Sequence, residues 1–170
     1  MSKAFTRESE SATEETFVPP WQSQLPPGAK NYITEGGVRH LRGEMDNLTS
    51  ERSELASRVS DESAKRRLQW IEARAAYLDQ SLSTAVVVPT PSPPYDQVRF
   101  GATVKVRESS GVETEYRIVG VDETDLDQNW ISFFSPIARA LMNQSLGAHV
   151  RFRIPAGEQS LEILSIRYIS

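Results

Sequence analysis

Apolar side chains recur every three or four residues over two consecutive stretches of the chain, a spacing typical of paired α-helices. The first stripe runs from Val38 to Val59 and is interrupted at Arg52, and the second runs from Ala64 to Leu82. The pattern predicts two amphipathic helices that bury these stripes against each other. The stripes consist of Val38, Leu41, Met45, Leu48, Arg52, Leu55 and Val59, followed by Ala64, Leu68, Ile71, Ala75, Leu78 and Leu82.

A short polar turn joins the two stripes and predicts an antiparallel helical hairpin. Ser60 or Asp61 is suited to cap the second helix, and Thr34 to cap the first. A first helix from Thr34 to Val59 would be about 25 residues, or about 38 Å, long. Because that length exceeds a compact domain of this size, the hairpin should project as an arm. The alternative, a small bundle, would need further long amphipathic helices, which the rest of the sequence does not supply.

From Val98 onward the apolar period changes to two, which is typical of strands. Residues 98–106 and 112–119 flank the turn-forming residues 108–111 and predict a β-hairpin. Ser135 and Pro136 begin a short predicted helix, as N-cap and first helical residue. Further strands are expected at 130–134, 150–154 and 161–169, and a short edge strand at 86–88.

These elements predict an α+β protein with an N-terminal antiparallel helical hairpin and a C-terminal antiparallel sheet that carries one short helix. Four prolines and little aliphatic content predict a flexible leader over residues 1–30. The predicted hairpin occupies 31–82, a proline-rich linker 83–97 and the sheet domain 98–170.

Composition narrows the classes of function. The 170 residues include no cysteine and two histidines, which excludes thiolate chemistry and makes a histidine-rich metal site improbable. The net charge of −4 argues against nucleic-acid binding through bulk charge. The longest apolar run, 85–88, is too short to span a bilayer, and no catalytic constellation is present. We therefore expect a cytoplasmic protein with a protein partner and no cofactor or metal of its own.

Several motifs from residue 30 onward recur in one known family, in its order and spacing. On these motifs the chain resembles the Gre transcript-cleavage factors, GreA and GreB, and the GreB type in particular. In the hairpin they are residues 31–34, 65–68 and 77–78, and in the sheet domain residues 100–104, 116–120, 122–123, 131–132, 135–142 and 155–158.

The resemblance implies an FK506-binding-protein-like sheet that docks at the rim of the secondary channel of RNA polymerase. It implies that the helical arm enters this channel, where acids at its tip help to hold a magnesium ion in the polymerase active site. The factor would be a regulator rather than an enzyme, and would meet nucleic acid only indirectly, within the transcription complex. We expect it to act as a monomer.

The tip departs from the family pattern. A Gly-Asp-x-x-Glu-Asn-Ala-x-Tyr-like segment of the family is absent, and the hairpin is about fourteen residues shorter, about one heptad per helix. Each helix would therefore lose about 10 Å of reach. Asp61 and Glu62 lie at the new tip, where we interpret them as acids of a solvated helix start rather than magnesium ligands.

The resemblance assigns polymerase contact to Ser135, Pro136, Ile137, Ala138 and Arg139, although the apolar members also suit a helix packed on its sheet. The acidic run beginning with Asp122 and Glu123 could bind a basic partner surface, or equally form a solvated loop. Arginines of the first helix could line RNA or channel acids, or be ordinary solvated positions. They are Arg39, Arg42, Arg52 and Arg58.

Three hypotheses follow. The preferred one is a polymerase-binding regulator that inserts its hairpin in the secondary channel without efficient stimulation of transcript cleavage. The second is a working cleavage factor that uses Asp61 and Glu62 toward the magnesium held by the polymerase. The third is a peptidyl-prolyl isomerase-like domain, which would need an aromatic-lined cavity. Its candidate residues are Tyr95, Phe100, Tyr116, Trp130, Phe133, Phe134, Phe152 and Tyr168.

Overall fold

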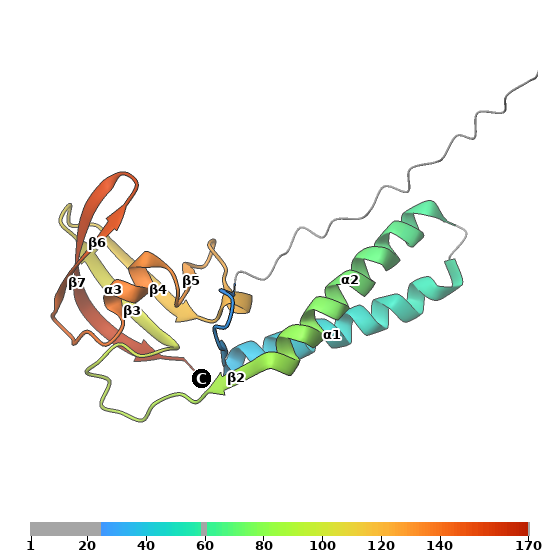
Figure 1. Ribbon diagram of the computed structural model, residues 1–170, viewed down its shortest axis with the longest axis horizontal. Helices are drawn as coiled ribbons and strands as arrows, with labels where there is room; N and C mark the ends of the chain where they lie inside the picture. Colours follow the sequence, from blue (N-terminus) through green and yellow to red (C-terminus); the bar gives the residue numbers. More distant parts are fainter. Residues whose placement is uncertain (1–24, 59–60, 170) are drawn as a thin grey trace, which may run out of the picture.

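A computed structural model describes residues 25–58 and 61–169 of the chain. A curled sheet domain forms one end, and a helical arm extends away from it (Figure 1). The leader predicted over residues 1–30 lies largely outside the described residues. The elements are β1 (Asn31–Thr34), α1 (Glu35–Leu55), η1 (Ala56–Arg58), α2 (Glu62–Thr84), β2 (Ala85–Val88), β3 (Ala102–Glu108), β4 (Glu113–Val119), η2 (Val121–Glu123), β5 (Trp130–Ser132), α3 (Pro136–Leu141), β6 (His149–Ile154) and β7 (Gly157–Tyr168).

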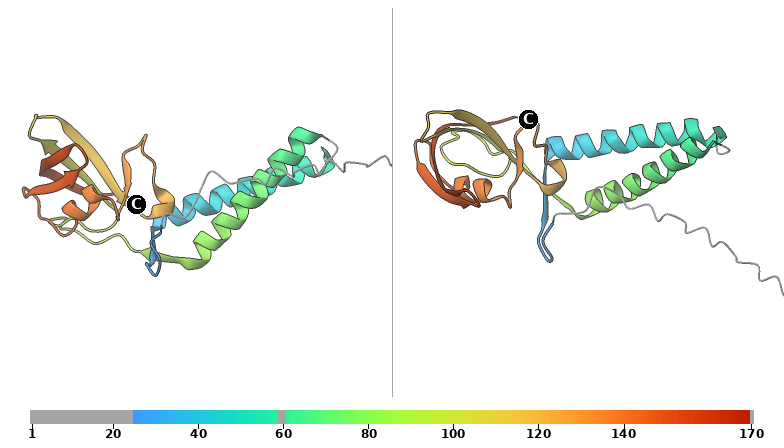
Figure 2. Two further views of the ribbon diagram at one scale, coloured as in Figure 1. Left: turned by 45° about the horizontal axis from the view of Figure 1, so that its top comes forward. Right: turned by 90° about the horizontal axis from the view of Figure 1, so that it is seen from above.

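The arm is a hairpin of α1 and α2, whose 21 and 23 residues pack along the predicted apolar stripes. Leu41, Ile71 and Leu78 are at most 1% exposed, and the remaining described stripe residues except Arg52 are buried or half-buried. Arg52 is exposed and lies 3.7 Å from Glu72 of the facing helix. Both views in Figure 2 show the arm reaching away from the sheet domain. Val59 lies outside the described residues.

Side-chain caps begin both helices where the sequence predicts them. Thr34 is the N-cap of α1, and its hydroxyl accepts a hydrogen bond from Gly37 N at 2.9 Å. Asp61 is the N-cap of α2, where its carboxylate accepts from Ser63 N at 2.9 Å. Such caps satisfy backbone N–H groups that have no partner within the helix. Ser60, the other candidate cap, lies outside the described residues.

The sheet domain has five strands in the order β5-β4-β3-β7-β6. The α+β class is confirmed, but the sheet is mixed, because β5 pairs parallel to β4 through Arg117–Trp130, Ile118–Ile131 and Val119–Ser132. The prediction of a wholly antiparallel sheet is wrong at this edge, because η2 and the following loop carry the chain back beside Arg117 of β4 before β5 begins. The sheet and α3 enclose a core that includes Val104, Ile118, Leu141 and Ile163.

A second, two-stranded sheet lies at the base of the arm. β1 precedes α1 and β2 follows α2, and the two pair parallel from Asn31–Ala85 to Thr34–Val88. The short strand predicted at 86–88 is therefore present, whereas its partner β1 is not predicted by the period of the sequence. Because β1 also packs against η2 and β4, it connects the arm to the sheet domain. No helix in the described part of the chain is both long enough and apolar enough to span a membrane.

Candidate functional site

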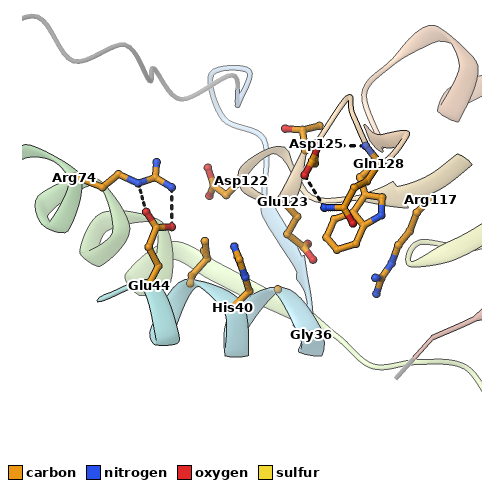
Figure 3. A pocket seen from close by; sticks show the side chains of 13 residues that line it. Gly36, His40, Glu44, Arg74, Arg117, Asp122, Glu123, Asp125 and Gln128 are labelled. Atoms are coloured by element: carbon orange, nitrogen blue, oxygen red, sulfur yellow. Dashed lines mark hydrogen bonds and ion pairs between the residues drawn. The ribbon is translucent and has the colours of Figure 1, made fainter. Parts of the chain in front are cut away.

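A cleft of about 400 Å³ lies where the base of the arm faces the sheet domain (Figure 3). α1 contributes His40 and Glu44 to its lining, α2 contributes Arg74, and the sheet domain contributes Arg117 and Trp130. Arg74 forms two hydrogen bonds with Glu44, of 2.6 and 2.9 Å, which join the two helices. The Arg117 guanidinium lies 4.7 Å from the centre of the Trp130 ring. Each of these pairs lies within one part, Glu44 with Arg74 in the arm and Arg117 with Trp130 in the sheet domain. We call the place where the two parts meet the joint.

Glu123, predicted as a partner-binding acid, lies inside this joint. It is 8% exposed, and its carboxylate accepts hydrogen bonds from Thr34 N at 2.9 Å, from Gly120 N at 3.1 Å and from the Thr34 hydroxyl. A carboxylate that is buried and bonded in this way has no free face for a partner. The structure therefore contradicts a docking role for Glu123.

Asp122 is half-buried and also has partners within the chain. Its carboxylate accepts from Asn31 Nδ2 at 3.1 Å and from the Tyr77 hydroxyl. Burial, assisted by the hydrogen bond to Asp122, raises the pKa of Tyr77 to about 12. Tyr77 therefore keeps its proton and remains a donor throughout the physiological range. Asp122 links the sheet domain to the arm rather than offering itself to a partner.

The segment predicted to contact polymerase divides into exposed and buried residues. Pro136 and Arg139 are exposed, while Ser135 and Ile137 are half-buried. The Ser135 hydroxyl accepts from Ala138 N at 3.2 Å and caps α3. Ala138 is completely buried in the sheet core, which contradicts a contact role for its side chain. The surface that remains for a partner consists mainly of Pro136 and Arg139.

Phe134 extends this surface and was missed as a docking candidate. Its ring centroid lies 4.0 Å from that of Phe133, and the Arg139 guanidinium lies 5.8 Å from the Phe134 ring. Phe133 in turn contacts Tyr32 of β1 and Phe100, with centroid separations of 5.7 and 5.5 Å. The available signal was the pair of adjacent aromatics before Ser135, which lie in the turn after β5 and are both half-buried. We call Phe134, Pro136 and Arg139 the loop surface.

The other aromatics considered for an isomerase cavity are used mainly in packing. Phe152 belongs to the core of the sheet domain, and Tyr95, Tyr116, Phe133 and Tyr168 pack against it. These contacts favour a filled core over an aromatic-lined binding cavity.

Asp61 and Glu62 both lie at the distal end of the arm, bonded to close neighbours in sequence. Besides capping α2, Asp61 accepts from the Ser63 hydroxyl at 2.9 Å. Glu62 accepts from Lys65 Nζ at 2.6 Å, and this hydrogen bond lowers the pKa of Glu62. Among the described residues, no group of three or more histidine and carboxylate side chains is placed to hold a metal ion. The arrangement at the tip is that of a capped helix start.

The remaining arginine candidates lie along the arm. Arg39 and Arg42 are exposed on α1, while Arg52 pairs with Glu72 across the hairpin. The side chain of Arg58 lies outside the described residues. Two further ion pairs cross between the helices, Glu51 with Arg67 and Glu44 with Arg74. Charges on the arm thus serve in part to join its two helices.

Comparison with known proteins identifies the family. Residues 92–168 match the family model described as transcription elongation factor, GreA/GreB, C-term. A transcription elongation factor GreB from Neisseria meningitidis is 40% identical over an alignment of 155 residues, which takes in 82% of this chain and 95% of the relative. The chain belongs to the GreA/GreB family of transcription elongation factors. The GreA of an Anaeromyxobacter strain is 36% identical to this GreA/GreB-family protein over 152 residues, 81% of this chain and 92% of the relative.

Solved structures of similar proteins include a GreA/GreB factor from Nitrosomonas europaea, with a TM-score of 0.41 and 20% sequence identity. The match covers 82% of this chain and 100% of the Nitrosomonas chain. Another is GreA factor homolog 1 of Thermus thermophilus, with a TM-score of 0.39 and 24% identity over 82% and 99% of the two chains. The alignment with the Neisseria GreB is 155 residues long, which is longer than the part of this chain that it takes in, 82% of 170 residues. That relative therefore carries residues within the matched stretch that this GreA/GreB-family protein lacks.

Proposed function

We propose that this protein docks on RNA polymerase at the rim of the secondary channel and places its hairpin in that channel. It acts there, in the cytoplasm, as a regulator of transcription elongation that does not efficiently stimulate transcript cleavage. Membership of the GreA/GreB family supports the elongation role. The observation that carries the non-cleaving part is the state of the tip, where both acids are bonded within their own turn.

Magnesium accepts oxygen ligands only at about 2.0–2.1 Å and in nearly octahedral geometry. Asp61 holds the cap of α2 with Oδ1 and Glu62 bonds Lys65 with Oε1, so each carboxylate is oriented by its own turn rather than toward a metal beyond the tip. The α1 helix, at 21 residues, is about 32 Å long. A hairpin shorter than its relatives by about one heptad per helix would stop about 10 Å before the metal. The additional residues of the Neisseria relative support this shortening, and we place it at the tip.

We assign docking to the loop surface, which consists of Phe134, Pro136 and Arg139. Aromatic residues and arginine are types that protein interfaces favour at their centres, and the exposed Pro136 lies between the two in sequence. Because Phe133 contacts Tyr32 of β1, this surface is joined to the strand from which the arm begins. A partner held at the loop surface would therefore meet the arm at a defined place.

The cleavage part is tested with stalled, backtracked transcription complexes. The wild-type protein should bind these complexes without shortening the RNA at concentrations that saturate binding. Rapid shortening would reject the non-cleaving proposal and favour the working cleavage factor. In that event the double variant Asp61→Asn/Glu62→Gln decides the role of the two acids, since asparagine preserves the helix cap. Activity retained in this variant would show that the negative charges of the two acids are not needed at the metal.

The docking part is tested by reversing one charge. Arg139→Glu should weaken polymerase binding by about tenfold, since a like-charge contact replaces a favourable one. The matched control is Arg151→Glu, an equally drastic change at an exposed arginine of β6, which should bind as the wild type does. Equal binding by all three proteins would place the docking surface elsewhere.

A further inference from the structure

The junction between arm and sheet domain depends on a carboxylate placed at the first residue of the arm. Glu123 accepts from both the backbone N–H and the hydroxyl of Thr34, and Thr34 is the N-cap of α1. The same carboxylate accepts from Gly120 N, at the end of β4. One side chain thus fastens the starting point of the helix to the adjoining strand of the sheet.

Two glycines make room for this close approach. A Cβ at Gly37, in the first turn of α1, would lie 2.2 Å from Glu123 Oε1. A Cβ at Gly120 would lie 2.1 Å from the carbonyl oxygen of Tyr32. Neither separation is sterically possible, so each glycine permits the helix start and η2 to come together. The joint is therefore built around the carboxylate from both sides.

Asp122 holds the second helix beside it. Its carboxylate accepts from Tyr77 of α2 and from Asn31 of β1, and Asn31 Nδ2 also lies 3.2 Å from the carbonyl oxygen of Ser81 near the end of α2. The neighbouring acids of η2 thus bind different helices, Glu123 the start of α1 and Asp122 the base of α2. A rotation of the arm would break bonds on both.

Apolar packing alone constrains the direction of the arm less strongly. The buried residues of the arm and those of the sheet domain form two separate clusters with no described residue in common. Hydrogen bonds weaken steeply when their angle departs from linearity, whereas apolar contacts tolerate sliding. The directional contacts at η2 are accordingly those that fix an angle.

We infer that Glu123 is a positioning residue that sets the direction of the arm relative to the loop surface. The inference rests on the proposed function in one respect: the direction matters because arm and loop surface must engage one polymerase together. Glu123 itself does not touch the partner. It acts through Thr34 and the start of α1.

The test measures the spread of arm directions in the full-length protein. Because the chain has no cysteine, Gln69→Cys on α2 and Ser110→Cys in the β3–β4 turn, both exposed, can carry two spin labels. The wild type should show one narrow distance distribution. Glu123→Ala should broaden it about twofold, because the hydrogen bonds of the joint are lost. Asp127→Asn, an exposed acid four residues further on, is the control and should leave the width unchanged.

Glu123→Gln keeps the test decisive if the alanine variant does not fold. The amide oxygen can still accept from the two backbone N–H groups, but the amide nitrogen cannot accept from the Thr34 hydroxyl. The distribution should therefore broaden measurably, and less than in alanine. A wild-type width in Glu123→Gln, or in a folded Glu123→Ala, would overturn the inference.

A functional readout separates direction from stability. Glu123→Gln should bind polymerase within about threefold of the wild type, because the loop surface is intact, while its effect on the rate of RNA elongation at saturation falls by a larger factor. Equal losses in both would contradict a positioning role. If the wild type does not bind polymerase, the proposed function fails, and the label distances still decide the role of Glu123.

Discussion

One pair of neighbouring acids lies at the base of the arm, supplied by η2 of the sheet domain, and another lies at its tip, and the two pairs have different environments. At the base, Asp122 and Glu123 bond to residues that are distant in sequence, including Asn31, Thr34 and Tyr77. At the tip, Asp61 and Glu62 bond to residues two and three positions away. Contacts between distant segments fix one part of a fold against another, whereas local contacts shape only their own turn. The base therefore determines where the arm points, and the tip determines how the arm ends.

The largest difference in stability between base and tip should come from the apolar stripes that α1 and α2 bury against each other. Leu78, near the base, is 0% exposed, so Leu78→Ala should lower the free energy of unfolding by about 2–5 kcal/mol. Leu55, near the tip, is half-buried, and Leu55→Ala should cost less because solvent can fill the space. Urea denaturation followed by circular dichroism measures both, with Gln80→Ala as an exposed control. Equal losses at the two leucines would contradict the graded packing of the arm.

A smaller loss is expected at the acids of the base. Asp122→Ala removes the acceptor from Tyr77 and one acceptor from Asn31, and should lower the free energy of unfolding by about 1–3 kcal/mol. Asp127→Ala, in the exposed part of the same acidic run, serves as the matched control. Should the two variants be equally stable, the bonds at Asp122 would contribute nothing to the joint.

At the tip, the stability of Asp61 variants shows whether this carboxylate is needed to cap α2. Asp61→Ala should lower the free energy of unfolding by about 0.5–2 kcal/mol. Asp61→Asn should lower it by much less than the alanine change, because asparagine is an equivalent cap. Thermal melts of the three proteins side by side provide the measurement. An unchanged alanine variant would mean that the carboxylate is not needed by its helix.

A further effect at the base appears only at alkaline pH. Since folding raises the pKa of Tyr77 from 10.0 to about 12, its contribution to stability is complete below pH 10 and is lost as the pH rises toward 12. Tyr77→Phe should therefore lose less stability than the wild type over this range. The measurement is the free energy of unfolding against pH for both proteins. Parallel curves would show that Tyr77 does not titrate differently in the folded and unfolded states.

Much of this structure can be read from local sequence. The heptad stripes predict α1 and α2, and Thr34, Asp61 and Ser135 are caps as predicted, because a helix and its cap depend on residues a few positions apart. The parallel pairing of β1 with β2 could not be predicted in the same way. These strands have four residues each and are separated by the whole hairpin, so neither contains a period from which a partner could be inferred.

The function of Glu123 is the clearest case of information that the local pattern lacks. In sequence it belongs to an acidic run, which is typical of a solvated loop. Only the fold places it under the start of α1. A signal was nevertheless present, because Gly36 and Gly37 weaken the opening turn of a helix, and a glycine at such a position leaves room for a close approach. Ala138 is the opposite case, because its spacing on α3 already directs it to the core and only the family resemblance assigned it to a partner.

The distance between the tip of the bound arm and the catalytic metal of polymerase tests the central claim most directly. When Fe²⁺ replaces Mg²⁺ in the polymerase active site, the hydroxyl radicals it generates cut protein chains that lie next to it. The claim predicts that the bound protein is not cut at residues 55–64, while a longer GreB added to the same complexes is cut at its tip. Strong cutting between Leu55 and Ala64 would show that the arm reaches the metal, and would contradict the account.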